Sequence, residues 1–155
     1  MKKPLYISAM LAMAALTTIV LLKFVILGKT GEVGDDGRTP VILTEHERDY
    51  VLAEMRGLIE GLVAMNEAAL DNDTQAFGSA AKSLGMHANP SAETTSVMGK
   101  LPVGFKVMGV GLHKDFDKIA ALAKSGATIT ELQRALTDNM YKCVACHASY
   151  KIEAE

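Results

Sequence analysis

The residues best suited to chemistry lie together in one pentapeptide of the sequence. It reads Cys143-Val144-Ala145-Cys146-His147. Two thiols separated by two residues, with a histidine directly after the second thiol, have the spacing of a c-type haem attachment site. The cysteines would bond the two haem vinyl groups as thioethers, and the imidazole of His147 would be the proximal ligand of the iron. On a helix these three side chains share about one third of the circumference, so one helical face could hold the porphyrin and its iron.

Two other interpretations of the Cys-x-x-Cys spacing stay open. A structural zinc ion needs four protein ligands, and with only two cysteines the rest would come from histidines at no recognised spacing. The histidines are His46, His87, His113 and His147. A thioredoxin-like dithiol normally opens a helix after a strand, whereas this motif lies within a predicted terminal helix. Both cysteines belong to the motif, so no disulfide framework and no further thiol are expected.

The composition of the chain favours helices and excludes some classes of function. The 155 residues carry a net charge of -2, which is not the basic surface typical of a nucleic-acid-binding protein. Hydrophobic residues make up 49% of the chain, with no Trp and 5% aromatic residues, which favours an Ala-, Leu- and Met-rich helical protein over a β-sandwich. The sequence contains no recognisable nucleophile–base pair or phosphate-binding loop, so we predict no enzyme activity.

Residues 1–27 are predicted to be an uncleaved membrane anchor. Two lysines precede an apolar run from Leu5 to Leu22, which resumes after Lys23. About 20 apolar residues span a bilayer, whereas the apolar core of a cleaved signal peptide has about 7–15. A cleavage signal at residues 12–14 is the alternative, but cleavage there would interrupt the apolar run. The basic N-terminus favours the cytoplasm, so the rest of the chain should lie on the outer side of the membrane. A c-type haem suits this side, because its thioethers are made on the outer face of the bacterial membrane, and we therefore expect an inner-membrane anchor with the domain in the periplasm.

The remaining chain is divided into a linker and one domain. Residues 28–40 are polar and glycine-rich and are predicted to be a flexible linker. Residues 41–155 contain four segments with helical apolar spacing, joined by turns and by a polar crossover over residues 86–100. The predicted helices begin near Thr44, Thr74, Pro102 and Thr130 and end near residues 70, 84, 124 and 150. This pattern predicts an all-α domain, an antiparallel four-helix bundle preceded by a transmembrane helix.

The motif and its place at the end of the fourth predicted helix resemble the class II c-type cytochromes, the cytochrome c prime family and its low-spin relatives. The resemblance rests on residues 143–151 and covers about residues 41–155. Class I cytochromes differ, because their haem motif lies near the N-terminus and a ligand Met follows downstream, whereas no Met follows His147 here. The family commonly has Arg after the Tyr of the motif, where this chain has Lys151. Tyr150 is expected to pack on the proximal side of the haem.

The resemblance also suggests which residue faces the iron from the other side. In an antiparallel bundle the end of the fourth helix lies beside the start of the first, and the rise per residue places Met55 at the level of His147. By resemblance to the low-spin members, Met55 is the expected sixth ligand. The alternatives are an open distal site with Met55 as a core residue, or ligation by His113 or Met108. Arg56 follows Met55 and is expected either to bind a haem propionate or to be a surface side chain.

The function that this resemblance implies is electron transfer. We expect a membrane-anchored protein with one covalent haem c that passes single electrons between periplasmic or membrane-bound redox partner proteins. The alternative is a five-coordinate protein of the cytochrome c prime type that binds nitric oxide or carbon monoxide. Two forms of assembly stay open from the sequence, a homodimer and a subunit of a larger respiratory complex.

Overall fold

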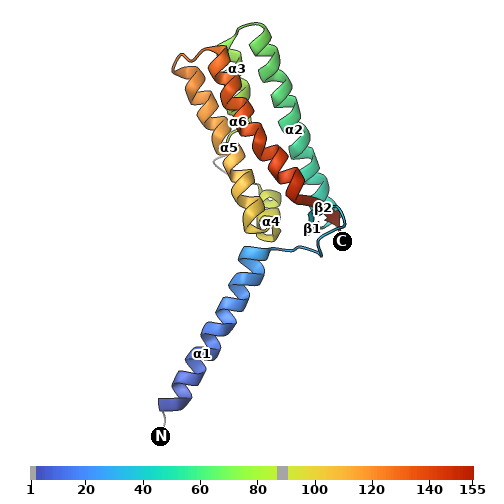
Figure 1. Cartoon of the computed structure of the whole chain (residues 1–155), viewed down its shortest axis with the longest axis vertical. Coiled ribbons are helices and arrows are strands. Elements are labelled where there is room, and N and C mark those ends of the chain that lie inside the picture. The colour runs from blue at the N-terminus through green and yellow to red at the C-terminus, as the bar shows by residue number, and fades with distance from the viewer. Residues whose placement is uncertain (1–2, 87–90) are drawn as a thin grey trace.

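The protein is mostly helical in the computed structural model, which describes residues 3–86 and 91–155; His87 lies outside this part. An N-terminal helix projects away from the remaining elements (Figure 1). The elements are α1 (Lys3–Val20), the π-helix η1 (Leu21–Leu27), β1 (Thr39–Leu43), α2 (Glu45–Leu70), α3 (Thr74–Ser83), α4 (Ala92–Lys100), α5 (Val103–Lys124), α6 (Ile129–Ser149) and β2 (Tyr150–Ala154).

Side-chain caps fix the beginnings of α2, α3, α4 and α6, and those of α2 and α3 lie where the sequence predicts them. The capping box at the start of α2 is confirmed: Glu47 N donates to Thr44 Oγ1 at 3.3 Å and Thr44 N donates to Glu47 Oε2 at 3.0 Å. The predicted cap at Thr130 is wrong, because α6 begins two residues earlier with a capping box between Thr128 and Glu131. The carboxylate of Glu131 accepts these bonds and also lies at the positive end of the helix dipole, an advantage that a glutamine lacks.

The expectation of a domain without strands is wrong, because β1 and β2 pair in parallel. The register runs from Thr39 opposite Tyr150 to Leu43 opposite Ala154. Val41 and Leu43 are completely buried, whereas Ile42 between them is only partly buried, so one face of this part of the strand lies on the core. α6 ends at Ser149, where β2 begins. The pairing thus connects the segment that precedes α2 with the segment that follows α6.

The expected polar crossover also contains a helix. Ser91 accepts a hydrogen bond from Thr94 N at 3.1 Å and thereby caps α4 (Ala92–Lys100). Val97 and Leu101 are buried against the two strands, so α4 closes one end of the domain.

The helices bury two separate apolar clusters. α3 packs against α2 and α5, and α5 packs against α6, whereas α2 and α6 approach each other only sparsely. The main core includes the fully buried side chains of Met65, Phe77, Phe116 and Leu132. The second core consists of Val41, Leu43, Val97, Leu101 and Phe105 and lies at the end of the domain that carries the strands.

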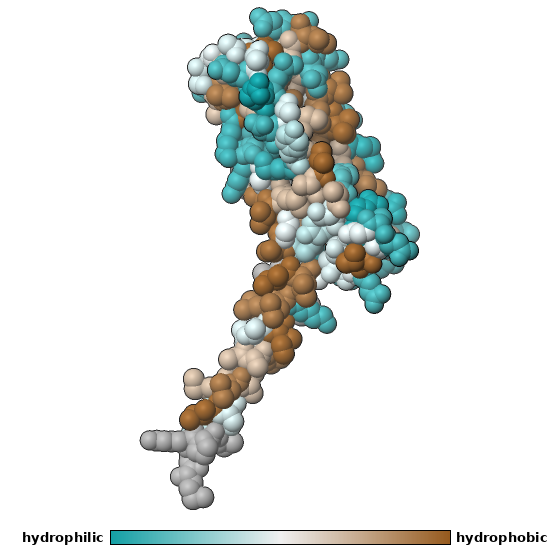
Figure 2. Space-filling view, in the orientation of Figure 1, coloured by the Kyte–Doolittle hydropathy of each residue, from teal (hydrophilic) through white to brown (hydrophobic). Residues whose placement is uncertain are grey.

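The N-terminal helix is long and apolar enough to cross a membrane. The segment Tyr6–Lys23 has a mean hydropathy of 1.8, and none of it is buried against the rest of the protein. Its surface is mostly brown, and thus mostly apolar, in Figure 2, with a few pale patches between.

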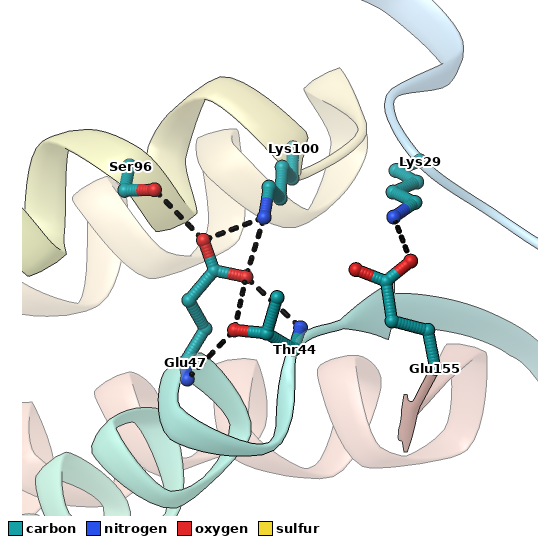
Figure 3. Close-up of polar contacts among 6 residues, drawn as sticks. All are labelled: Lys29, Thr44, Glu47, Ser96, Lys100 and Glu155. Carbon is teal, nitrogen blue, oxygen red and sulfur yellow. Dashed lines mark hydrogen bonds and ion pairs between the residues drawn. The ribbon is translucent and has the colours of Figure 1, made fainter.

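Residues 28–40, the segment assigned as a linker, make specific contacts with the domain. Lys29 N donates to the Lys100 carbonyl at 2.7 Å, and Ile42 N donates to the Lys29 carbonyl at 2.8 Å. Gly28 adopts a positive φ of 64° and lies so close to the Lys100–Pro102 backbone that a Cβ would meet Lys100 O at 2.4 Å. Lys29 also forms an ion pair with Glu155 (Figure 3).

A buried carboxylate joins the beginning of α2 to α4. Glu47 is only 6% exposed, and its oxygens accept hydrogen bonds from Lys100 Nζ at 2.6 Å and from Ser96 Oγ at 2.7 Å, in addition to the Thr44 cap (Figure 3). Lys100 is the main reason that the pKa of Glu47 falls to about 2, and the bonds from Thr44 and Ser96 add to this effect. A charged Glu47 therefore stabilises the folded protein.

We predict that Glu47→Gln lowers the free energy of unfolding at pH 7 by about 1–3 kcal/mol, because buried donors lose their charged acceptor. The pKa of Glu47 is lower in the folded chain than its usual value of 4.5, so the stabilisation is present above pH 4.5 and is lost as the pH falls towards 2. Urea unfolding followed by circular dichroism at several pH values should show that the two proteins converge over this range. Glu60→Gln, an exposed change on the same helix, is the control; an equal loss in both variants would contradict the prediction.

Candidate functional site

The last turns of α6 place both thiols of the pentapeptide between the two apolar clusters. Cys143 packs against the main core and Cys146 packs against the second core, and each is half-buried. His147 follows on the same helix and is exposed. The three side chains therefore border a common region on the inner side of α6.

The surroundings of the two thiols are apolar rather than activating. Burial raises the pKa of Cys143, and burial together with the neighbouring Cys143 raises that of Cys146. Redox-active Cys-x-x-Cys motifs have lowered thiol pKa values. Raised pKa values are the opposite of the electrostatic setting of a thioredoxin-like dithiol.

Two hollows flank this region, where α2 and α6 lie apart. The inner hollow has a volume of about 140 Å³ and lies between α2, α5 and α6. It is lined by Val51, Glu54, Met55, Leu58, Phe105, Met108, Gly109, Leu112, His113, Lys142, Cys143, Cys146 and His147. The outer hollow has a volume of about 260 Å³ and is lined by Arg38, Leu52, Met55, Phe105, Cys146, His147, Tyr150, Lys151 and Ile152. Met55, Phe105, Cys146 and His147 border both.

The structure brings some of the predicted site residues together and leaves one apart. Met55 is half-buried on α2 and borders both hollows together with His147. Met108, the rival on α5, lines the inner hollow only. Arg56 is exposed and lines neither hollow. Met65, farther along α2, is a core residue with no exposed surface.

His113 lines the inner hollow with a fixed ring orientation. Its Nδ1 lies 2.7 Å from the carbonyl oxygen of Leu84, and because a carbonyl only accepts, Nδ1 carries the proton. In the neutral ring Nε2 is then the atom with a free lone pair. Histidines that bind metals commonly donate their other N–H to a carbonyl in this way, so His113 stays a chemically competent rival to Met55.

Tyr150 lines the outer hollow and belongs to β2 rather than to a helix. Its ring centroid lies 5.4 Å from that of Phe105, with an interplanar angle of 57°. A Cβ on Gly104 would lie 2.5 Å from the Tyr150 hydroxyl, so the glycine makes room for this ring. Tyr150 thereby forms one wall of the outer hollow beside Cys146 and His147.

A buried polar contact holds the α5–α6 wall of the inner hollow. Asn139 is 1% exposed, and its Nδ2 donates to the Leu112 carbonyl at 3.1 Å. Lys142 donates to Asn139 Oδ1 at 3.2 Å and forms an ion pair with Asp115. Lys118 and Lys142 hold the pKa of Asp115 below its usual value. These bonds fix the helix that carries the cysteines relative to α5.

Gly109 leaves space on the α5 side of the inner hollow. A Cβ at this position would meet no atom within 4 Å, although the residue lines the hollow. The space suits a bulky group next to the thiols. Among the described residues, no three His, Cys, Asp or Glu side chains are grouped to hold a metal ion, so they do not assemble the four-ligand set of a structural zinc site.

Four further residues of these linings were given no role from the sequence and bear on the chemistry of the outer hollow. Leu52 and Phe105 supply apolar walls, and Arg38 and Lys151 supply positive charge to the outer hollow. Leu52 and Phe105 belong to predicted helical stripes, so their inward position could have been inferred. Arg38 reaches the site only through the pairing of β1 with β2.

No protein-family model, no curated protein and no solved structure shows significant similarity to this chain.

Proposed function

We propose that this protein is a membrane-anchored monohaem c-type cytochrome of class II architecture, a four-helix bundle that carries single electrons between periplasmic or membrane-bound redox partners. The observation that carries the proposal is the joint placement of Cys143, Cys146 and His147 around apolar space that also contains Met55. When bound, haem would supply an iron centre that accepts and releases one electron.

The residues at the site fit such a group. Ligand cavities usually have volumes of about 300–1,000 Å³, so a porphyrin would occupy both hollows rather than either one. The sparse contact between α2 and α6 and the space beside Gly109 favour such an occupant. Cys143 and Cys146 would hold the group covalently, and His147 would bind the iron from the proximal side.

Met55 is the proposed ligand on the opposite side. It extends from α2 to border the same two hollows as His147, and it is half-buried rather than part of either apolar core. A thioether ligand would fill the sixth position and favour electron transfer over binding of small gases. The apolar walls would keep water from the iron and so help to set its reduction potential.

The anchor and the location are part of the same proposal. The apolar helix would fix the chain in the inner membrane of a bacterium with the haem domain on the periplasmic side, following the basic N-terminus. This location suits exchange of electrons with other redox proteins at the membrane, including a larger respiratory complex.

We predict that the intact denatured protein has the mass of the polypeptide plus one haem. Each single change, Cys143→Ala or Cys146→Ala, leaves one thioether and should retain the added mass, whereas the double variant should lose it under denaturing conditions. Mass spectrometry of the three variants and the wild type tests this. Stoichiometric zinc without haem in the wild type would contradict the proposed function.

Met55→Ala is expected to remove the weak long-wavelength charge-transfer band that a Met–ferric iron bond produces, and to convert a low-spin spectrum into a high-spin one. Met108→Ala is the matched control, since Met108 lines only the inner hollow, and it should keep both features. Absorption spectra of the ferric proteins provide the measurement. A wild-type protein that is high-spin and binds carbon monoxide without displacing a ligand would instead be a gas-binding protein.

Membranes washed with alkaline carbonate should retain the full-length protein with an uncleaved N-terminus. Replacing both Leu11 and Leu16 by Asp should release it, because each charge near the middle of the span costs about 2.5–3.5 kcal/mol. Immunoblots of the fractions and N-terminal sequencing follow the outcome. A soluble form that starts near Ala15 would show that the helix is a cleaved signal.

A further inference from the structure

Two cations border the outer hollow in positions that the proposed attachment and ligation do not use. Arg38 and Lys151 line this hollow together with His147 and Cys146. Most of the remaining lining is apolar or aromatic, including Leu52, Phe105 and Ile152. The outer hollow is therefore a mainly apolar space bordered by two cations.

The strand pairing brings these cations to the site from distant parts of the chain. In the parallel register Thr39 lies opposite Tyr150 and Pro40 lies opposite Lys151. Arg38 directly precedes β1, so it is held beside the segment that follows the pentapeptide. The position of both cations is thus a consequence of the buried strand pair and not of a mobile surface loop.

Both cations keep the capacity to bind a further carboxylate. Arg38 Nε and Nη2 donate to Asp36 Oδ2 at 2.9 and 2.8 Å, which uses two of the five N–H donors of a guanidinium. Lys151 Nζ lies 3.0 Å from Glu153 Oε1. The side chains of Asp36 and Glu153 are 42% and 46% exposed, and ion pairs of this kind contribute only about 0–1 kcal/mol. A carboxylate in the less hydrated hollow would compete well with them.

We propose that Arg38 and Lys151 are the binding residues for the two propionates of the haem, an inference that rests on the proposed function. The hollow matches a flat apolar ligand with carboxylates along one edge, and it offers one cation for each carboxylate. This assignment replaces Arg56, whose exposed side chain lines neither hollow.

The test compares the haem-loaded full-length proteins carrying Arg38→Ala, Lys151→Ala, both changes, or the control Arg56→Ala. Loss of a cation leaves a propionate charge uncompensated, which favours the ferric state, so the midpoint potential should fall in each single variant and further in the double variant. The propionate-bending bands of the resonance Raman spectrum should shift in the same proteins. Arg56→Ala removes an equal charge and should change neither readout.

Arg38→Lys keeps the charge but not the planar fork of donors, so its potential should stay close to the wild-type value while the Raman band moves. The intact mass should show one haem in every variant, because attachment depends on the cysteines. Unchanged bands and potential in the Arg38 and Lys151 double variant, with haem still attached, would overturn the propionate assignment alone. A protein without covalent haem would overturn the proposed function and this inference together.

Discussion

The parallel pairing of β1 with β2 is the constraint on which the rest of the domain depends. It buries Val41 and Leu43 completely and connects the residues that precede α2 with those that follow α6. The strand pairing therefore holds the start of α2 near the end of α6, although the two helices make few contacts with each other. The space left between them is bordered by Met55 from one helix and by Cys146 and His147 from the other. The strands thus organise a site whose chemical groups lie on helices.

The electrostatics of this space suit a covalently held apolar cofactor better than a reactive thiol pair. Burial raises the pKa of both thiols, and they lie between apolar clusters rather than at a helix N-terminus. Polar groups are kept to the margins: Asn139 and Lys142 fix the α5–α6 wall, and Arg38 and Lys151 border the outer hollow. An apolar centre bordered by cations is what the proposed haem, an apolar ring with two carboxylates, would need.

The helices could be predicted from the sequence because their signals are local. Capping residues such as Thr44 with Glu47 and Asp73 mark the starts, and the 3.6-residue spacing of apolar side chains marks the buried faces. The strands were not predicted because each has only five residues. Each is stabilised by pairing with the other, and the paired residues Val41 and Ile152 lie over 100 residues apart in the sequence. The position of Arg38 beside the outer hollow depends on the same pairing, whereas the sequence left Arg56 open between a propionate contact and a surface side chain, and in the structure it is exposed. The short helix α4 was hidden by its polar composition, since only Val97 is buried within it.

The most direct test of the central claim is a crystal structure of the full-length protein with anomalous diffraction measured on both sides of the iron absorption edge. We expect one iron peak in the space between α2 and α6, bound to the His147 imidazole, with Cys143 and Cys146 each bonded to the porphyrin. A zinc peak bound by the two cysteine sulfurs, or free thiols with an apolar contact between α2 and α6 in place of a cofactor, would contradict it.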